Sequence, residues 1–304
     1  QLKGAPKKIY LIGASEGGII TTLAIEQRPD LFAAGVAACG PIGSFRGQLD
    51  YFGSARVTFE YFFPGLIPGD PFNPTPELVA TWKTYYETVV KPYLLDPAHR
   101  TALDEWVAVA RLPYDPNDYL NTVEQSARDV LLYTVVDLNE AADVLGGFPF
   151  GNLRKRYTGS SDDAALNAAV LRVEAAAAAL SEVKANYETT GVLARPLVTM
   201  HTRLDQQIPF WHEQLYALKT LLSGSLLTRH INLPVNRYGH CNFNANEALL
   251  SFGVMLLYDG LLQEISGVGT YLSGDQLKAF EAGAKTARLP YRVSGPRLRV
   301  TLKP

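Results

Sequence analysis

The sequence predicts an α/β protein with a mostly parallel β-sheet flanked by helices and a large helical insertion within it. Near both ends of the chain, short apolar runs alternate with helical patterns, which is typical of the βαβ units of a parallel sheet. Between these segments, residues 44–193 are rich in aromatic residues and prolines, and their apolar positions recur at helical spacing. We therefore expect a sheet-based core made of residues 1–43 and 194–304, with a helical domain over residues 44–193.

The first βαβ unit occupies the start of the chain. Residues 9–12 are β-formers without alternation, which predicts a strand buried on both faces. A glycine-rich turn follows, and residues 19–27 are predicted to form a helix. Residues 32–39 form a second small, apolar strand that Gly40 and Pro41 end.

The insertion is predicted to be helical after a connector that holds five prolines between residues 64 and 76. Apolar stripes predict one helix over residues 78–93 and another over residues 166–187, which residues 160–163 precede. Eight aromatic residues suit a hydrophobic acyl or aryl pocket, although most are expected in the core of the insertion: Phe59, Tyr61, Phe62, Phe63, Trp82, Tyr85, Tyr86 and Trp106.

The sheet pattern then resumes. Residues 197–201 and 228–233 are predicted strands, separated by a helix over residues 209–222, and a long apolar helix is expected over residues 245–265. The remaining residues form a tail of mixed character.

Composition excludes several classes of function. The chain has 304 residues, 47% of them hydrophobic, and a net charge of −2, which argues against a general nucleic-acid binder. No run of roughly 18 apolar residues predicts a transmembrane segment. Metal-binding and nucleotide-binding motifs are missing from the sequence, so no cofactor is expected.

The motif Gly13-Ala14-Ser15-Glu16-Gly17 lies between the first predicted strand and its helix. It matches G-x-S-x-G, in which a serine on a strained strand-to-helix turn exposes its hydroxyl, and glycines beside it avoid clashes. The alternative is a glycine-rich turn whose serine only caps the helix.

Asp205 and His240 follow later predicted strands, so the chain order is serine, aspartate, histidine. A histidine can remove the proton of a serine hydroxyl, and a carboxylate can orient the imidazole and stabilise its charged form. Asp205 could instead cap the helix near residue 209, and His240 could be an ordinary loop residue. Four other histidines are rival bases: His99, His201, His212 and His230. Of these, His201 is the strongest rival, but a supporting polar or packing role is expected for it.

At these residues the chain resembles the α/β-hydrolase superfamily of serine esterases, lipases and prolyl-oligopeptidase-like peptidases. The resemblance implies that Ser15 is the nucleophile, His240 the base and Asp205 its orienting acid. It also implies that the backbone N–H of Glu16 is one oxyanion-hole donor and that residues 44–193 form a lid.

One departure from the family concerns the start of the sheet. Intact members have several strands before the serine, and the loop after one of them supplies the second oxyanion donor, whereas here the serine strand comes first. We therefore expect the second donor outside this chain, and an N-terminal segment or partner chain that completes the sheet of a longer enzyme.

Cys39 and Cys241 are both expected at the carboxyl edge of the sheet, either as a disulfide or as two buried thiols. A cysteine beside the catalytic histidine also occurs in the similar tannases and feruloyl esterases, where its partner precedes the serine; this chain has Ala14 there. A disulfide would favour an extracellular or periplasmic location.

The function that this resemblance implies is a serine carboxylic-ester hydrolase that forms an acyl-enzyme. Its substrate would be a small-molecule or polymeric ester with a hydrophobic or aromatic part. A prolyl-oligopeptidase-like serine peptidase is one alternative, which Gly17-Gly18 favours slightly. A non-catalytic, hydrolase-like binding protein is the other.

Overall fold

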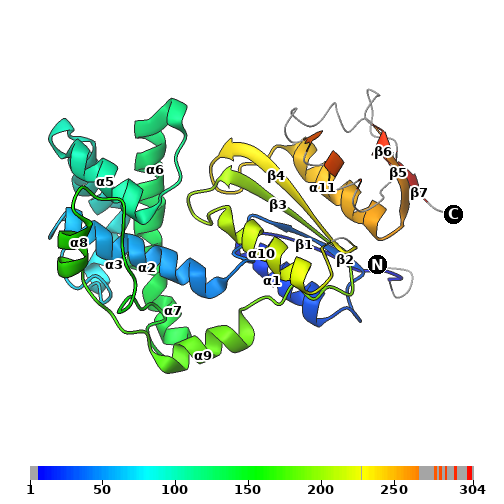
Figure 1. Cartoon of the computed structure of the whole chain (residues 1–304), viewed down its shortest axis with the longest axis horizontal. Coiled ribbons are helices and arrows are strands. Elements are labelled where there is room, and N and C mark those ends of the chain that lie inside the picture. The colour runs from blue at the N-terminus through cyan, green and yellow to red at the C-terminus, as the bar shows by residue number, and fades with distance from the viewer. Residues whose placement is uncertain are drawn as a thin grey trace. The chain divides into compact units, whose positions relative to one another are not determined.

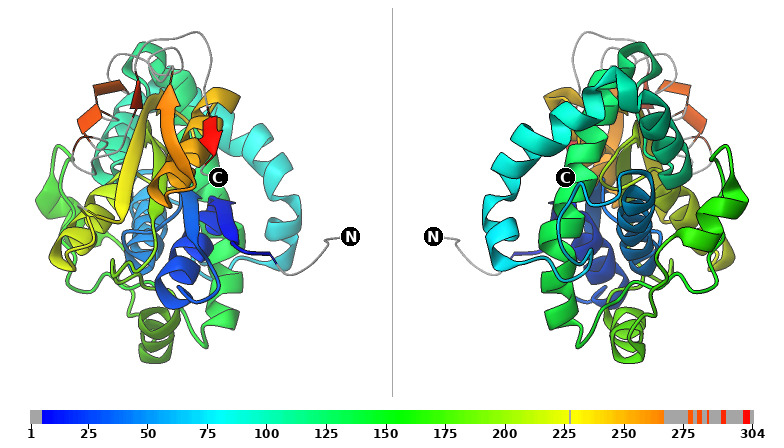
Figure 2. Two further views of the ribbon diagram at one scale, coloured as in Figure 1. Left: turned by 90° about the vertical axis from the view of Figure 1, so that its right-hand side faces the viewer. Right: turned by 90° about the vertical axis from the view of Figure 1, so that its left-hand side faces the viewer.

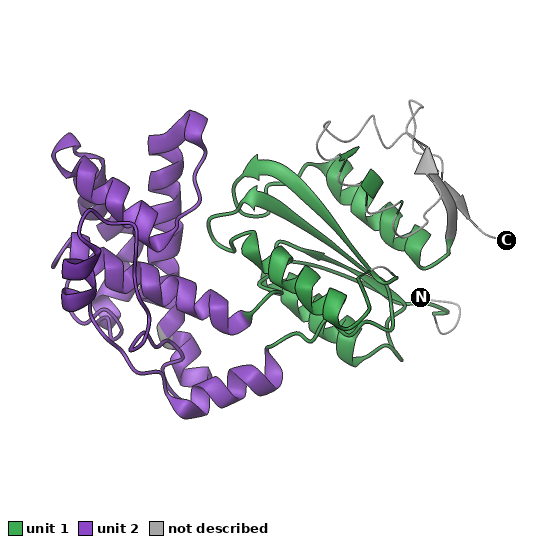
Figure 3. Cartoon of the chain, in the orientation of Figure 1, with its two compact units in different colours: residues 1–44, 188–304 green, residues 45–187 purple. Residues whose placement is uncertain are grey.

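A computed structural model describes residues 6–226 and 228–266, together with residues 277–278, 281–282, 285, 291–292 and 300–302. The chain divides into two compact units, which Figure 3 colours separately. Unit 1 contains Gln1–Ser44 and Glu188–Pro304, and unit 2 contains Phe45–Tyr187. Most of the predicted C-terminal tail lies outside the described residues.

Unit 1 is built on a four-stranded sheet in the order β1-β2-β3-β4, and all of its neighbouring strands are parallel. The strands are β1 (Tyr10–Ala14), β2 (Ala34–Ala38), β3 (Leu197–Leu204) and β4 (His230–Tyr238). Helices α1 (Glu16–Gln27) and α10 (Trp211–Leu222) pack on one face, and α11 (Ala245–Tyr258) packs on the other (Figures 1 and 2). This arrangement confirms the predicted α/β class with a parallel sheet flanked by helices.

The core of unit 1 lies between this sheet and α11. Small and branched residues from β2, β3 and β4, such as Val36, Val198 and Ile231, pack with Val254 and Met255 of the helix. β2 and β3 have strand neighbours on both sides and form the centre of the sheet, where all of β2 and the first six residues of β3 are buried.

The first strand differs from the expectation of burial on both faces. Ile12 of β1 is 56% exposed, and Ile9 just before the strand is 42% exposed. Within the part of the chain that the structure describes, β1 pairs with β2 alone. The prediction was wrong because local β-propensity does not report whether a strand has a second neighbour.

The end of the predicted 245–265 helix also differs. α11 ends at Tyr258, and Gly260 follows with a φ of 73°, the left-handed conformation that ends helices. The chain then forms a small three-stranded sheet of β5 (Leu262–Ser266), β6 (Tyr291–Arg292) and β7 (Val300–Leu302).

Unit 2 consists of helices and their connecting loops, and it enters the sequence between β2 and β3. Its α-helices are α2 (Phe45–Phe62), α3 (Pro76–Tyr85), α4 (Lys91–Leu95), α5 (Arg100–Ala110), α6 (Tyr119–Leu132), α7 (Leu138–Val144), α8 (Asp163–Ala169) and α9 (Ala177–Asn186). Two π-helical turns, η1 (Tyr86–Val90) and η4 (Tyr133–Asp137), and two 3₁₀ turns, η2 (Pro97–His99) and η3 (Pro116–Asp118), connect them.

The single helix predicted over residues 166–187 is divided into α8 and α9. Between them the backbone is extended and bonds to an earlier segment: Val173 N–H donates to Asn152 Oδ1 at 2.7 Å, and Asn152 N–H donates to the Val173 carbonyl at 2.9 Å. These tertiary hydrogen bonds replace the helical ones. The apolar residues do recur at helical spacing, but the prediction that they form a single helix was wrong.

Five of the eight aromatic residues singled out in the insertion belong to its core. Phe59, Phe63, Trp82, Tyr86 and Trp106 are each at most 3% exposed. The Trp106 indole donates to the Ala55 carbonyl at 3.0 Å, so its polar atom is also satisfied inside the unit. These five side chains therefore stabilise unit 2 and are not free to line a pocket.

None of the described helices combines the length and the apolar character that crossing a bilayer requires.

Candidate active site

The turn from β1 into α1, residues 13–18, places Ser15 in a strained backbone conformation. Ser15 has φ 58° and ψ −124°, a region that residues with a Cβ rarely adopt. Its N–H donates to the Ala38 carbonyl at 2.9 Å, and its own carbonyl accepts from the Gly18 N–H at 2.8 Å. The surrounding hydrogen bonds therefore hold the strain and project the side chain at the carboxyl edge of the sheet.

The glycines of this turn are not equivalent. A Cβ on Gly13 would overlap the Gly17 carbonyl group, and a Cβ on Gly18 would lie 2.7 Å from the Ala38 carbonyl oxygen and 3.0 Å from the Gly40 Cα. A Cβ on Gly17 would meet no atom within 4 Å. The expectation that both glycines of the five-residue motif avoid clashes is therefore wrong for Gly17, while Gly18 is required for close packing of α1 on the end of β2.

This difference predicts opposite outcomes for two adjacent substitutions. Gly18→Ala is expected to lower the free energy of unfolding by about 1–3 kcal/mol, because backbone atoms that cannot move freely oppose the new methyl group. Gly17→Ala, the matched control, is expected to change it by less than about 1 kcal/mol, since Ala is favoured over Gly in a helix. Urea denaturation of both variants measures the difference, and equal destabilisation would contradict it.

Asp205 and His240 lie on the loops that follow β3 and β4. Because all four strands are parallel, these loops and the Ser15 turn meet at the same edge of the sheet. His240 Nε2 lies 2.8 Å from Ser15 Oγ, and His240 Nδ1 lies 2.9 Å from Asp205 Oδ2. The structure thus brings together the three side chains that the sequence singled out, in one hydrogen-bonded chain.

The tautomer of His240 follows from these partners. A carboxylate only accepts, so Nδ1 carries the hydrogen that it donates to Asp205, and Nε2 is free to accept from the Ser15 hydroxyl. Asp205 Oδ1 also accepts from the backbone N–H groups of Gln207 and Ile208, at 3.0 and 2.9 Å. These two N–H groups belong to the turn before α10, whose N-cap is Phe210 without a side-chain hydrogen bond, so Asp205 does not cap that helix.

The histidine loop is anchored at several points. Thr202 Oγ1 donates to the Gly239 carbonyl at 2.6 Å, and Gly239 adopts φ 106°, which a side chain would disfavour. Cys241, directly after the histidine, forms a disulfide with Cys39 at the end of β2, with a Cα–Cα distance of 5.4 Å. These contacts leave the imidazole only 13% exposed and fix its loop to the neighbouring strand.

The remaining histidines do not contact Ser15 in the structure. His99 lies in unit 2, stacked on Tyr93. His212 accepts from the Gly43 N–H at 3.1 Å, and His230 lies between Thr199 and Thr220. Burial lowers the pKa of His212 and lowers that of His230 to about 4, so both rings are neutral at physiological pH.

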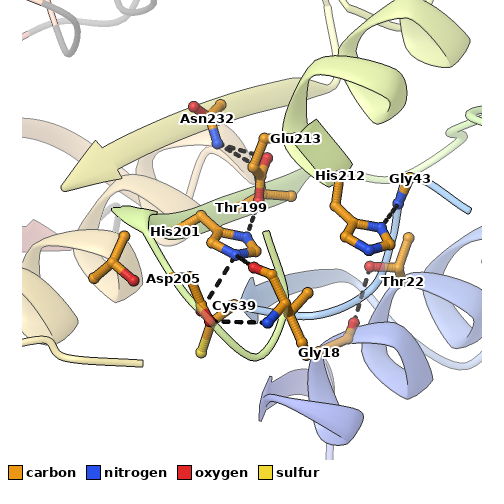
Figure 4. Close-up of polar contacts among 12 residues, drawn as sticks. Gly18, Thr22, Cys39, Gly43, Thr199, His201, Asp205, His212, Glu213 and Asn232 are labelled. Atoms are coloured by element: carbon orange, nitrogen blue, oxygen red, sulfur yellow. Dashed lines mark hydrogen bonds and ion pairs between the residues drawn. The ribbon is translucent and has the colours of Figure 1, made fainter. Parts of the chain in front are cut away.

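His201 behaves differently, because it is a fully buried histidine between two carboxylates. Its Nε2 lies 3.4 Å from Asp205 Oδ2, and its Nδ1 lies 3.3 Å from Glu213 Oε1 (Figure 4). Burial alone would lower the pKa of His201, but the hydrogen bonds and charges of Asp205 and Glu213 raise it to about 10. Burial likewise acts to raise the pKa of Asp205, and the hydrogen bonds from His201 and His240 outweigh it and lower that pKa to about 2.

The partnership with Glu213 was missed in the sequence. Glu213 lies in the first turn of α10, one residue after His212, and no local pattern distinguishes it from an ordinary surface glutamate. It is only 2% exposed because α10 packs this side against β3 and β4. The pairing arises from contacts between elements, which sequence spacing does not specify.

The charge on His201 predicts a loss of stability at alkaline pH. Its pKa is raised above the ordinary 6.5 to about 10, so the stabilisation is complete below pH 6.5 and disappears as the pH rises through 10. We expect the free energy of unfolding to fall between pH 7 and 10 in the native protein, and to fall less in Glu213→Gln. Urea denaturation at several pH values tests this, and parallel curves for the two proteins would contradict it.

One cluster within the described residues has the geometry of a metal site: Cys39, His240 and Cys241. Its two sulfurs are joined in the disulfide and are not available as thiolate ligands. The chemistry of this set therefore does not fit a metal ion while the bridge is intact.

A separate groove of about 910 Å³ lies within unit 2. Phe72, Phe148 and Val173 supply apolar walls, and Arg172 and Asp143 supply charge. Arg172 is held by the Asn152 carbonyl at 2.9 Å and the Asn167 carbonyl at 3.0 Å, so its guanidinium serves the local structure.

Comparison with known protein families identifies the part of the chain that contains Ser15. A model of the prolyl oligopeptidase family matches residues 4–51, which include the Ser15 turn and the disulfide residue Cys39. The chain resembles the α/β-hydrolases. No curated protein matches the sequence.

Three solved structures are similar to the chain at low sequence identity. Feruloyl esterase B from Aspergillus oryzae has 14% identity and a TM-score of 0.46, over 83% of this chain and 60% of its own. An esterase from Aspergillus oryzae has 16% identity and a TM-score of 0.35, over 77% of this chain and 52% of its own. The proline iminopeptidase of Mycobacterium smegmatis has 12% identity and a TM-score of 0.33, over 83% of this chain and 66% of its own. The chain thus spans about 60% of the length of the first of these proteins.

Proposed function

We propose that this protein is a serine hydrolase of the carboxylesterase type, with Ser15, His240 and Asp205 as its catalytic residues. The observation that supports the proposal is the continuous hydrogen-bonded chain from Ser15 Oγ through His240 to Asp205, with contacts of 2.8 and 2.9 Å. A serine hydroxyl is a weak nucleophile until a base accepts its proton, and this geometry supplies both the base and the carboxylate that orients it.

In the proposed reaction, Ser15 Oγ attacks the ester carbonyl carbon while His240 Nε2 accepts the hydroxyl proton. The tetrahedral intermediate collapses when His240 donates that proton to the leaving alcohol, which leaves an acyl group on Ser15. Water then attacks the acyl carbonyl carbon while His240 Nε2 takes a proton from it. When this second intermediate collapses, His240 returns that proton to Ser15 Oγ, the bond between Ser15 and the acyl group breaks, and the acid is released. Asp205 remains ionised throughout and stabilises the positive charge on His240.

The negative charge of the tetrahedral intermediate needs hydrogen-bond donors. Glu16 is the first residue of α1, so its backbone N–H has no acceptor within the helix and lies at the positive end of the helix dipole. We assign one oxyanion-hole bond to this N–H, and the Glu16 side chain, which the solvent reaches, needs no part in it.

We further propose that unit 2 acts as a lid that selects esters with a hydrophobic or aromatic part. Its place in the sequence, between β2 and the strand that leads to Asp205, supports this role. The disulfide beside the histidine supports a location outside the cytoplasm, because such bridges persist in oxidising compartments.

A serine peptidase is the second candidate, and the match of residues 4–51 to the prolyl oligopeptidase family favours it. Both candidates need the same three side chains, so substrates must separate them. We expect p-nitrophenyl esters to be hydrolysed at least about 100-fold faster, by kcat/KM, than proline-containing peptide anilides. The reverse order would favour the peptidase.

Covalent labelling tests whether the site is catalytic at all. A fluorophosphonate probe is expected to label the native protein at the peptide that contains Ser15, and His240→Ala is expected to label far more slowly. A folded protein that takes no label and hydrolyses neither substrate class would favour the non-catalytic binding protein.

A further inference from the structure

His201 and Glu213 form a buried pair behind the proposed catalytic acid. His201 lies on β3 and is 0% exposed, and its Nε2 lies 2.7 Å from the Ile208 carbonyl oxygen. A carbonyl oxygen only accepts, so this nitrogen carries a hydrogen. The same nitrogen faces Asp205 Oδ2 at 3.4 Å (Figure 4). His240 Nδ1 contacts this same carboxylate oxygen at 2.9 Å.

The other ring nitrogen faces an acceptor that already holds two hydrogen bonds. Glu213 Oε2 accepts from Thr199 Oγ1 at 2.7 Å and from Asn232 Nδ2 at 2.6 Å, and its Oε1 faces His201 Nδ1 at 3.3 Å. A buried carboxyl group that accepts several hydrogen bonds is stabilised as the anion, and a buried anion requires a cation beside it. Among the residues that the structure describes, His201 is the side chain that forms an ion pair with Glu213.

We propose that His201 is a positively charged positioning residue, which holds the Asp205 carboxylate opposite His240 and keeps His240 in its neutral, base-competent form at lower pH. The inference rests on the proposed function, because His201 acts through the acid of that catalytic set. Asp205 would then contact two histidines. His201 would influence the protonation of His240 and would not itself transfer a proton to the substrate.

The groups around His201 are consistent with a single positive charge at this position. From α10, Glu213 contacts His201 and His212 interacts with it electrostatically, and from β4 the titratable ring of His230 contacts Thr199, two residues before His201. Burial keeps both of these rings neutral. Arg203 of β3 packs over the Phe210 ring at 4.9 Å, and that ring meets His201 by its edge.

The nearest other cation of α10 is already engaged. Lys219 donates to Glu188 Oε2 at 3.2 Å and to the Thr189 carbonyl at 2.8 Å. Asp205 therefore has two histidine neighbours, of which His201 carries the positive charge and His240 is the neutral base.

The expected functional consequence follows from repulsion between like charges. When His240 accepts the serine proton, it becomes positive while it contacts Asp205 Oδ2, the carboxylate oxygen that His201 also faces. The permanent charge on His201 opposes protonation of His240 from solvent, so the base stays neutral to lower pH. Removing that charge should move the acid limb of the kcat/KM profile to higher pH.

Glu213→Gln is the sharpest variant because it can keep every hydrogen bond while removing both charges. The glutamine oxygen can accept from Thr199 and Asn232, and its NH₂ group can donate to Nδ1 of a neutral His201 that still donates to Ile208. We expect the acid limb to move up by about half to one pH unit, which is about a 3- to 10-fold loss of kcat/KM below the midpoint. Above the midpoint, kcat/KM should stay within about threefold of the native value.

His230→Gln is the matched control, because it changes a buried, neutral histidine on the other side of Thr199 that does not contact Asp205. It is expected to lower stability without moving the acid limb. If Glu213→Gln does not fold, the double variant His201→Gln with Glu213→Gln, which also has a neutral pair, takes its place with the same expected shift.

Imidazole ¹⁵N chemical shifts of the native protein at pH 8 separate this inference from the proposed function. Two protonated nitrogens on His201, with one in Glu213→Gln, would support the charged pair whether or not the protein hydrolyses esters. A neutral His201 in the native protein would overturn the inference, and so would an unchanged acid limb in an active Glu213→Gln enzyme. A protein that shows the charged pair but neither turnover nor fluorophosphonate labelling would overturn the proposed function, and with it the tuning role of His201.

Discussion

Ser15→Ala is expected to lower kcat for p-nitrophenyl esters by about 10⁴- to 10⁶-fold while leaving the fold intact. The hydroxyl is the atom that would form the acyl-enzyme, and alanine leaves His240 without a nucleophile to activate. The substitution removes one oxygen at the carboxyl edge of the sheet, where Ser15 is half-buried, so little packing is lost. Stopped assays with purified protein, and circular dichroism for the fold, measure the two effects.

The matched control is Ser251→Ala, which removes a hydroxyl from α11 in the same unit. Ser251 Oγ donates to the Ala248 carbonyl at 2.8 Å inside its own helix, away from the Ser15 turn. It should retain native kcat. Esterase activity retained in Ser15→Ala at a native level would show that Ser15 is not the nucleophile, and a neighbouring nucleophile would then have to be sought by labelling.

Loss of the Cys39–Cys241 disulfide is expected to have the second large effect, on both stability and activity. The bridge closes a loop with a sequence separation of 202 residues. Removing such a link typically lowers the free energy of unfolding by about 2–5 kcal/mol, because the unfolded chain regains its freedom. Since Cys241 follows His240 directly, we also expect kcat to fall about 10- to 100-fold as the imidazole loses its fixed position.

The double variant Cys39→Ala with Cys241→Ala tests this without leaving an unpaired thiol. Urea denaturation gives the change in stability, and ester hydrolysis gives the change in kcat. The native protein in the presence of a reducing agent should show the same two losses, whereas the double variant should not respond to the reductant. Native activity and stability in the double variant would show that the sheet and the hydrogen bond from Thr202 to Gly239 hold the histidine loop unaided.

Local sequence patterns predicted the parts of unit 1 whose structure depends on near neighbours. The run of β-formers before Gly13, the glycine-rich turn and the following helix all lie within twenty residues, and they form β1, the Ser15 turn and α1. Asp205 and His240 each follow a later strand in the sequence. Because the carboxyl ends of parallel strands share an edge of the sheet, these two residues lie at the same edge as Ser15.

Other predictions failed where distant contacts decide the local structure. The apolar stripe over residues 166–187 is real, yet Asn152 and Val173 bond to each other and divide the helix. β4 continues to Tyr238 through Pro234, because among the described residues it pairs only with β3 and one side of its backbone needs no strand partner. The predicted helix over residues 245–265 ends early, at Tyr258, because Gly260 adopts the left-handed conformation that ends a helix.

By itself, the sequence determined the candidate reactive side chains and their order along the chain: a serine in a glycine-rich turn, then an aspartate, then a histidine followed by a cysteine. Only the tertiary structure decided how these groups interact. It joined Cys39 to Cys241, left Gly17 unconstrained while confining Gly18, and set His201 between Asp205 and Glu213. The physical reason is that pairing, steric contact and the ionisation of a buried ring depend on distances between side chains from different elements, which the folded sheet and its helices create.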